Sequence, residues 1–240
     1  MSFSPARLRS LARPTRRLIL APGDVGAQPV TKVGGTPWWP AIVPRPRCEH
    51  GHQKSFLGQV LLQDVPGRQS EKGLVSLHYC LKCSDQEQMS FGRGGRYRGY
   101  AVTIFDDLAA APDGLGTRAR SCLPALVASL SEVEEFPGLH DCWELGIELP
   151  DAEIEGAGDL DEEIWPGVVH VARSKLGGWP SWDQDSQWPE CSEGKRMGLV
   201  MQLDYELGRH SPWAAGGHAF LFGCESACRA READLVIQTT

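Results

Sequence analysis

Most of the chain consists of short apolar runs or of alternating apolar and polar residues, which is the pattern of β-strands. Residues 73–80 show the alternation well, because Val75, Leu77 and Tyr79 are separated by polar residues. The same criteria predict further strands over residues 16–21, 56–62, 97–105, 168–172, 199–205, 219–224 and 235–238. The chain is therefore expected to be strand-rich.

Only one segment has a clear helical pattern. Residues 123–136 carry Leu123, Leu126, Val127 and Leu130 at helical spacing, and Pro137-Gly138 follows as a stop signal. This pattern predicts a helix over residues 123–136. Residues 141–148 fit either a weak strand or a short helix.

A long motif occurs twice. Residues 32–59 align without a gap to residues 175–202, at an offset of 175 − 32 = 143. About two identities are expected by chance in such a window, whereas nine are found: Lys32/Lys175, Gly34/Gly177, Gly35/Gly178, Pro37/Pro180, Trp39/Trp182, Pro46/Pro189, Cys48/Cys191, Gly51/Gly194 and Gln59/Gln202. A repeat indicates two copies of one supersecondary unit.

The repeat and the strand pattern together predict the fold class. We expect an α+β, strand-rich fold with an internal duplication of a β-meander unit, packed into one pseudo-twofold body with few helices. The first half would span residues 1–150, with a basic N-terminal segment. The second half would span residues 151–240 and follow an acidic connector.

The Lys-x-Gly-Gly-x-Pro-x-Trp part of the motif predicts a structural turn. Glycine pairs permit positive φ, and Trp39 and Trp182 supply apolar area beside the bend. A phosphate-binding loop is disfavoured, because the lysine precedes the glycines and no helix follows. Gln59 and Gln202 lie inside apolar strands, where we expect each to satisfy backbone groups of a loop.

Charge and hydropathy narrow the class of protein. The net charge of −7 argues against a nucleic-acid-binding protein, and no apolar run approaches the ~20 residues that span a bilayer. Residues 1–19 contain five arginines and no acid, which fits a basic helix and a first strand better than a targeting segment. We expect a cytoplasmic protein without membrane contact. The acidic residues 144–163 form a solvated connector or attract a basic protein partner.

Eight cysteines in a reducing compartment indicate free thiols or metal ligands. Cys80 and Cys83 form a C-x2-C pair at a strand end, and Cys48 lies two residues before His50. Three thiolates and one imidazole would complete a closed, structural Cys3His zinc site. Two alternatives remain open, namely buried thiols that pack as small hydrophobes and a redox pair.

The second repeat has a different set of candidate ligands. Cys191, Cys224 and Cys228 occupy the cysteine positions, but Glu193 replaces the imidazole. Whether this set binds a metal stays open. No catalytic motif is present; an enzyme with a site in a groove between the halves, using His210, His218 or Asp204, is an alternative.

The doubled Lys-x-Gly-Gly-x-Pro-x-Trp motif, the following cysteine and the glycine eight residues before a strand glutamine resemble the YwqG-like family of bacterial proteins of unknown function. The same combination of motifs is more distantly similar to that of the programmed cell death protein 2 family. The resemblance covers roughly residues 13–240. The families commonly have Cys-x2-Cys-Gly where this chain has His50-Gly51 and Glu193-Gly194.

The resemblance implies protein binding and transfers no catalytic residues. Some bacterial members look like immunity proteins, and the eukaryotic relatives look like dedicated chaperones. We therefore expect a module that binds one partner protein, of immunity or chaperone type, with a structural zinc ion. A purely structural zinc protein is a further alternative.

Overall fold

The computed structural model describes residues 9–83, 99–113, 121, 123–147, 171, 173–204, 207, 217–224, 228 and 231–238. Within these residues the protein is strand-rich. The strands are β1 (Arg13–Pro22), β2 (Lys32–Val33), β3 (Ser55–Leu61), β4 (Leu74–Tyr79), β5 (Tyr100–Phe105), β6 (Leu126–Glu135), β7 (Lys175–Gly177), β8 (Gly198–Leu203), β9 (His218–Gly223) and β10 (Ala233–Gln238). A 3-10 turn, η1 (Leu62–Asp64), and an α-helix, α3 (Leu139–Glu144), accompany them.

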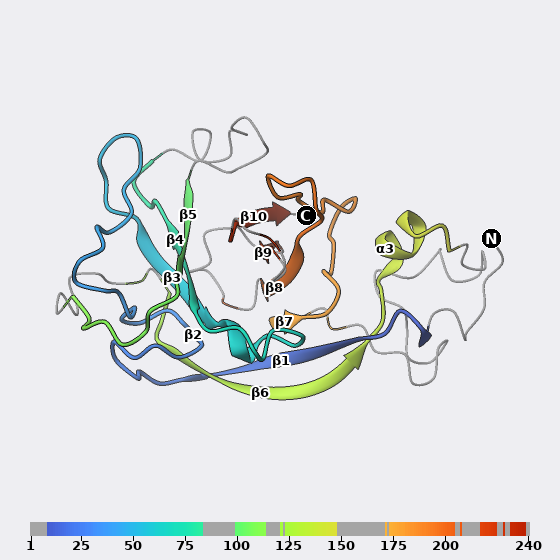
Figure 1. Ribbon diagram of the computed structural model, residues 1–240, viewed down its shortest axis with the longest axis horizontal. Coiled ribbons are helices and arrows are strands. Elements are labelled where there is room, and N and C mark those ends of the chain that lie inside the picture. Colours follow the sequence, from blue (N-terminus) through green and yellow to red (C-terminus); the bar gives the residue numbers. More distant parts are fainter. Residues whose placement is uncertain are drawn as a thin grey trace.

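All ten strands belong to one antiparallel sheet, in the order β10-β9-β8-β7-β1-β6-β2-β3-β4-β5. The long strands β1 and β6 run together along one side of the molecule (Figure 1). Strands β7–β10 continue the sheet beyond β1, and strands β2–β5 continue it beyond β6. The sheet curls until its edge strands β5 and β10 come close to each other, which makes it nearly closed. Arg231, just before β10, pairs with Asp106, just after β5.

Seven of the predicted strands are confirmed where the structure describes them. They are residues 16–21 (β1), 56–62 (β3), 73–80 (β4), 97–105 (β5), 199–205 (β8), 219–224 (β9) and 235–238 (β10). The segment 141–148 begins with residues of α3 and is helical there. Most of the predicted strand at 168–172 lies outside the described residues. So do the boundary between residues 150 and 151 and nearly all of the acidic segment 144–163. The two-domain division stays a prediction.

The predicted helix over residues 123–136 is wrong, because most of this segment is strand β6. All ten residues of β6 pair with β1, from Leu126↔Pro22 to Glu135↔Arg13. A spacing of four residues is one helical turn but also two strand repeats, so Leu126 and Leu130 share a face in either structure. Ala128 completes the alternating set, and all three pack against the core.

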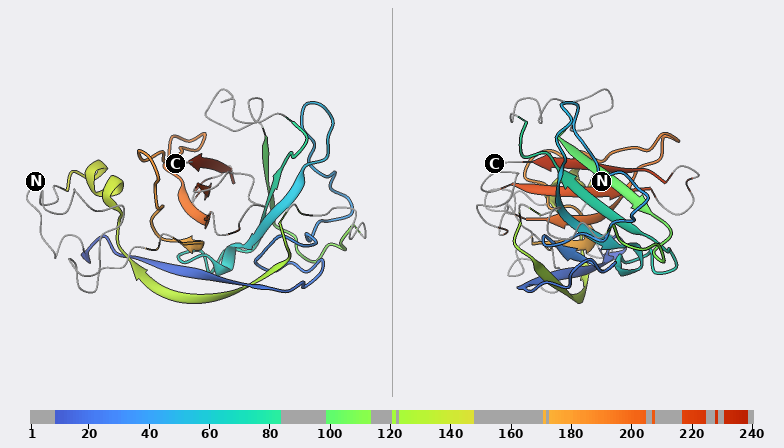
Figure 2. Two further views of the ribbon diagram at one scale, coloured as in Figure 1. Left: turned by 180° about the vertical axis from the view of Figure 1, so that it is seen from behind. Right: turned by 90° about the vertical axis from the view of Figure 1, so that its left-hand side faces the viewer.

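The core lies inside the curled sheet. We call strands β2–β5 and strands β7–β10 the two arms of the sheet. The main apolar cluster joins both arms and includes Val60 and Leu77 of the first and Met201 and Leu221 of the second. The view from behind shows the two arms facing each other above β1 and β6 (Figure 2, left). Apolar area removed from water on folding stabilises at about 25 cal/mol per Å², so the facing arms depend on each other for burial.

The two motif segments have the same local pairing. Lys32 is opposite Gln59, and Lys175 is opposite Gln202. The register also shifts at corresponding places, between Phe56 and Gly58 and again between Leu199 and Met201, where 199 − 56 = 143.

The Gly-Gly turns adopt the predicted conformation. The φ values are +67° and +69° at Gly34 and Gly35, and +69° and +75° at Gly177 and Gly178. A Cβ atom on Gly34 would overlap the carbonyl oxygen of Pro124. Positive φ and close approach together explain why glycine stands there.

Gln59 and Gln202 satisfy loop backbone, as predicted. Gln59 accepts a hydrogen bond from the Trp38 N–H at 2.9 Å and donates to Gln28 and Val30 carbonyls. Gln202 accepts from the Ser181 N–H at 2.9 Å and donates to the Arg173 carbonyl at 3.2 Å. Each glutamine therefore ties its strand to the loop around its Gly-Gly turn.

Candidate functional site

A tight turn presents the first candidate metal ligands. The Cys48 N–H donates to the His52 carbonyl and the Gly51 N–H to the Cys48 carbonyl, both at 2.9 Å. Gly51 has φ +79°, which favours glycine. The backbone N–H groups of His50 and His52 also donate to the Cys48 sulfur. Amides that point at a sulfur stabilise a thiolate, which is the form that binds a metal.

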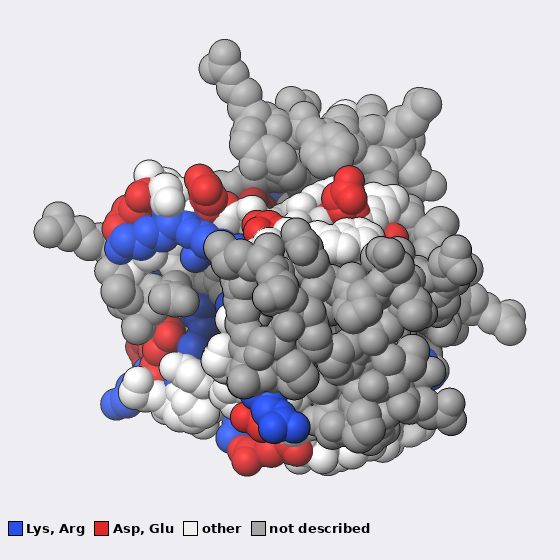
Figure 3. All heavy atoms as spheres, turned by 90° about the vertical axis from the view of Figure 1, so that its right-hand side faces the viewer, with Lys and Arg blue, Asp and Glu red and all other residues white. Residues whose placement is uncertain are grey.

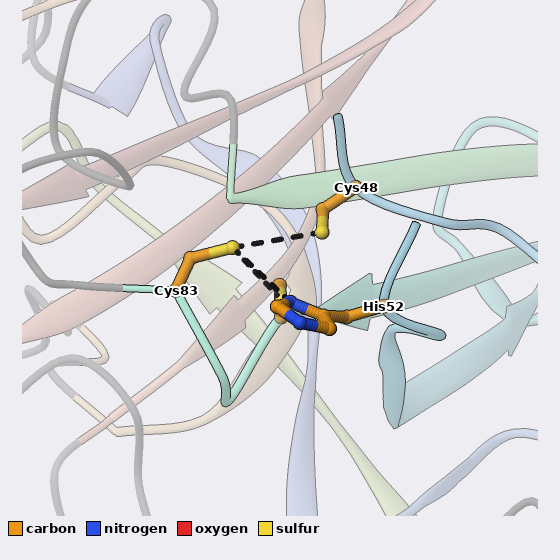
Figure 4. Close-up of side chains that lie close together, drawn as sticks. Cys48, His52 and Cys83 are labelled. Atoms are coloured by element: carbon orange, nitrogen blue, oxygen red, sulfur yellow. Dashed lines mark hydrogen bonds between the residues drawn. The ribbon is translucent and has the colours of Figure 1, made fainter. Parts of the chain in front are cut away.

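Two further thiols meet this turn from the end of β4. Cys80 directly follows β4 and is fully buried, and Cys83 lies in the next turn. The Cys83 sulfur lies 3.3 Å from that of Cys80, 3.5 Å from that of Cys48 and 3.8 Å from Nδ1 of His52. Cys48, His52 and Cys83 point toward one another (Figure 4).

The donor set fits a zinc ion. The ligand atoms of Cys48, His52, Cys80 and Cys83 all lie within 4.8 Å of one another. Zn–S bonds of about 2.3 Å in a tetrahedron place sulfurs about 3.8 Å apart. The observed sulfur–sulfur separations, 3.3 and 3.5 Å, are somewhat shorter than this value. The possible metal site therefore contains all three cysteines that the sequence predicts.

Two imidazoles compete for the fourth position. The sequence predicts His50, whereas the compact ligand group contains His52. Nδ1 of His50 nevertheless lies 3.5 Å from the Cys83 sulfur, and the two rings are 6.2 Å apart. His50 is exposed and His52 is half-buried. The choice of His50 stays a prediction, and His52 joins it as a candidate that the turn geometry brings inward.

The electrostatics of this cluster favour one thiolate. Burial opposes ionisation of Cys48, but hydrogen bonds from Cys83 and from the amides of His52 and His50 lower its pKa to about 6. The hydrogen bond to Cys80 and burial raise the pKa of Cys83 to about 12. Nζ of Lys54 donates to the Tyr100 carbonyl at 2.6 Å beside the cluster. Burial lowers the pKa of Lys54, and the negative charge of the neighbouring cysteines acts in the opposite direction.

Three cysteines also gather in the other arm. The sulfurs of Cys191, Cys224 and Cys228 lie within 4.8 Å of one another, and all three residues are buried. Glu193, at the position that corresponds to His50, forms an ion pair with Lys195 at 3.1 Å. No disulfide joins any of the described cysteines.

Two residues of the enzyme alternative, Asp204 and His218, lie near each other, because Leu203 of β8 pairs with Ala219 of β9 and the two side chains interact electrostatically. Nδ1 of His218 lies 2.7 Å from Oδ2 of Asp183. Oδ2 of Asp204 accepts a hydrogen bond from the Ser174 N–H at 3.1 Å. His210 lies outside the described residues.

A cleft of about 490 Å³ lies beside the second Gly-Gly turn. We call it the arginine cleft, because Arg13, Arg68 and Arg196 line it together with the single carboxylate of Glu71. The remaining lining residues are Pro14, Pro66, Gly67, Gly177, Gly178, Trp188, Met197, Gly198 and Leu199. Sequence reasoning missed this cleft, because its arginines are far apart along the chain.

Aromatic rings hold two of the cleft arginines. The guanidinium of Arg13 lies 3.5 Å from the ring centre of Trp179, and that of Arg196 lies 3.9 Å from the ring centre of Trp188. Arg196 also pairs with Glu144 at 3.2 Å. On the face drawn in Figure 3, the described basic and acidic side chains lie next to one another. Three guanidinium groups and one carboxylate line the cleft. Arg68 pairs with that carboxylate, Glu71, at 3.6 Å, so the positive charge of the lining is partly compensated by this pair and by the pair of Arg196 with Glu144.

No family model matches the chain, and no curated protein matches it. None of the helices that the structure describes is long and apolar enough to cross a membrane.

Proposed function

We propose that this protein is a YwqG-like protein-binding module that escorts or neutralises one partner protein and uses a zinc ion as a structural staple. The observation that carries the proposal is the arginine cleft, which combines guanidinium groups with tryptophan. Arginine and tryptophan are enriched among the residues that dominate binding energy at protein interfaces. The proposed zinc ligands are Cys48, Cys80 and Cys83 with an imidazole of the same turn.

The proposal includes an internal duplication. The equal pairing of the motif lysines with Gln59 and Gln202, and the equal register shifts, support two copies of one meander. The copies differ in their buried lysines. Nζ of Lys32 donates to the carbonyls of Gly26 and Thr36, whereas Nζ of Lys175 pairs with the buried Glu135 at 2.5 Å. In the second copy, the motif lysine thus forms an ion pair with a carboxylate of β6.

The arginines of the cleft support a proposal for the part of the partner that binds there. Arg13 lines the cleft beside two arginines that already pair with Glu71 and Glu144. Its guanidinium favours a carboxylate, from an acidic side chain or a C-terminus, because arginine binds carboxylates through two parallel hydrogen bonds. The ring faces of Trp179 and Trp188 keep Arg13 and Arg196 in place and so reduce the entropy lost on binding. A basic partner, by contrast, would depend on the acidic segment 144–163, which lies almost wholly outside the described residues.

The test uses the tagged full chain. Stoichiometric partners are captured from its native source and identified by mass spectrometry, and the affinity for the purified partner is then measured by calorimetry. We expect Arg13→Glu to weaken binding at least tenfold. Arg17→Glu is the matched control, because Arg17 is exposed on the same strand and does not line the cleft. Equal affinity of both variants, or the lack of any stoichiometric complex, would refute the proposal.

The zinc part has its own test. Purified protein should contain about one zinc ion in the first cluster, and His52→Ala should reduce its retention against a chelator more than His50→Ala does. The two histidines are matched controls for each other, because they belong to one turn. If only His50→Ala releases zinc, His50 is the ligand. If neither variant does so, the imidazole ligand is wrong.

A further inference from the structure

The second cysteine cluster has the geometry of a metal site and not only of an apolar core. Cys191, Cys224 and Cys228 are 6%, 7% and 7% exposed and lie among aromatic residues. The sulfurs of Cys191 and Cys228 are 3.8 Å apart, which is about the separation of two thiolates on one tetrahedral zinc ion. Packing of thiols in an apolar core does not require three sulfurs to lie within 4.8 Å of one another, as they do here.

The backbone supplies an independent indication. The Cys191 N–H donates to the Lys195 carbonyl and the Gly194 N–H to the Cys191 carbonyl, both at 2.9 Å. These are the same two bonds that shape the turn at Cys48, and Gly194 has φ +70°. The N–H groups of Glu193 and Lys195 donate to the Cys191 sulfur. Such donors stabilise a thiolate in surroundings that are otherwise apolar.

The fourth ligand of the first cluster has no counterpart here. His52 corresponds to Lys195, since 195 − 52 = 143, and an ammonium does not bind a metal ion. Glu193 is paired with Lys195 and does not belong to the compact ligand group. The protein therefore offers three thiolates and no fourth ligand among its described residues.

We propose that Cys191, Cys224 and Cys228 form a second metal site, which binds one thiophilic d¹⁰ ion through three thiolates. With the ligands that the described residues supply, Zn²⁺ or Cd²⁺ would keep one coordination position for a small exogenous ligand, whereas the first cluster offers four protein ligands. Three thiolates and a divalent ion carry a net charge of −1. The ammonium of Lys195, which pairs with Glu193, also interacts electrostatically with Cys228 and Cys191. The site does not depend on the proposed binding function.

Wild-type protein is sufficient for the first test. The apo-protein is loaded with Zn²⁺ or Cd²⁺, its metal content is measured, and its thiols are alkylated before and after chelation. We expect two ions per chain, and Cys191, Cys224 and Cys228 should become reactive on chelation. Cys142 is the internal control, because it is fully buried but outside both clusters. One ion per chain, with the three thiols equally reactive before and after chelation, would overturn the proposal.

Two double variants then assign the ions. Cys191→Ser with Cys228→Ser should leave one ion, held by the first cluster, and Cys48→Ser with Cys83→Ser should leave the other. Cys142→Ser should retain both. Exchange against a chelator should be faster from the three-thiolate site. Two ions in the Cys191/Cys228 variant would refute the assignment even if the first zinc site is correct. If that variant fails to fold, the alkylation result on the wild type decides.

Discussion

The buried carboxylate of Glu135 offers the sharpest test of the fold. Glu135 is fully buried at the end of β6. Its Oε1 accepts from Nζ of Lys175 at 2.5 Å and from the Val171 N–H at 2.8 Å. Its Oε2 accepts from Oγ1 of Thr15 at 2.8 Å and from the Trp179 N–H at 3.0 Å. One side chain thus joins β1, β6 and the second Gly-Gly turn.

Glu135→Gln keeps the shape of the side chain but removes its charge. An amide NH2 in place of Oε1 faces two donors, and in place of Oε2 it faces the Trp179 N–H. In either orientation Lys175 keeps a buried ammonium without the carboxylate of Glu135. Breaking a buried ion pair by removing one partner costs about 3–5 kcal/mol. We therefore expect a loss of about 3–5 kcal/mol in the free energy of unfolding.

Urea unfolding at neutral pH, with zinc kept constant, measures the effect. Glu132→Gln is the control, because that carboxylate is 77% exposed and pairs with Arg16 at the surface, where an ion pair contributes about 0–1 kcal/mol. Adding Lys175→Met to Glu135→Gln should cost less than the same change in the wild type, since it removes the unpaired charge. Equal losses for Glu135→Gln and Glu132→Gln would refute the reasoning.

Three further predictions concern single side chains. Burial raises the pKa of Asp141 from 3.8 to about 6, so wild-type stability should fall as pH rises from about 4 to 6. Urea titrations should show that Asp141→Asn removes this slope and is more stable at pH 7 by about 3 kcal/mol, at about 1.4 kcal/mol per pKa unit. An unchanged slope would contradict this. Burial, together with the charges of Arg45 and Lys54, lowers the pKa of His78 from 6.5 to about 3. The wild type should therefore lose stability as pH falls from 6.5 toward 3, and His78→Phe should lose less over that range in the same assay. Gly34→Ala should lower stability by more than about 2 kcal/mol, because φ is +67° and a Cβ atom would meet backbone atoms. The control Gly26→Ala should cost about 1 kcal/mol, because φ is +63° there but the surrounding space is open. Equal melting temperatures of the two variants would exclude the predicted overlap at Gly34.

The strands could be predicted from the sequence where apolar residues alternate with polar ones or form a short run. Alternation in residues 73–80 and apolar runs such as 56–62 and 199–205 predict β4, β3 and β8, because burial of one or both faces leaves that pattern in the residues themselves. The segment 126–135 misled, since leucines four residues apart suit a helix and a strand alike. Its pairing with β1 on one side and β2 on the other decided the outcome.

The candidate metal ligands were only partly readable. Local spacing brings Cys80 and Cys83 together, and the shared motif places Cys48. The choice between His50 and His52 depends on the hydrogen bonds of one turn, which no spacing rule specifies. The arginine cleft has no local signal, because Arg13, Arg68 and Arg196 meet only after β1, the loop after η1 and β8 are assembled.

The sequence by itself determined the strand-rich class, the positive-φ Gly-Gly turns, the buried glutamines and the first group of thiols. These features depend on residues close in the chain or on a repeated motif. Tertiary structure alone decided the strand β6, the hydrogen bonds of Glu135 and the convergence of Cys191 with Cys224 and Cys228. The physical reason is that long-range backbone pairing and burial set these environments, and both depend on residues that are distant in sequence.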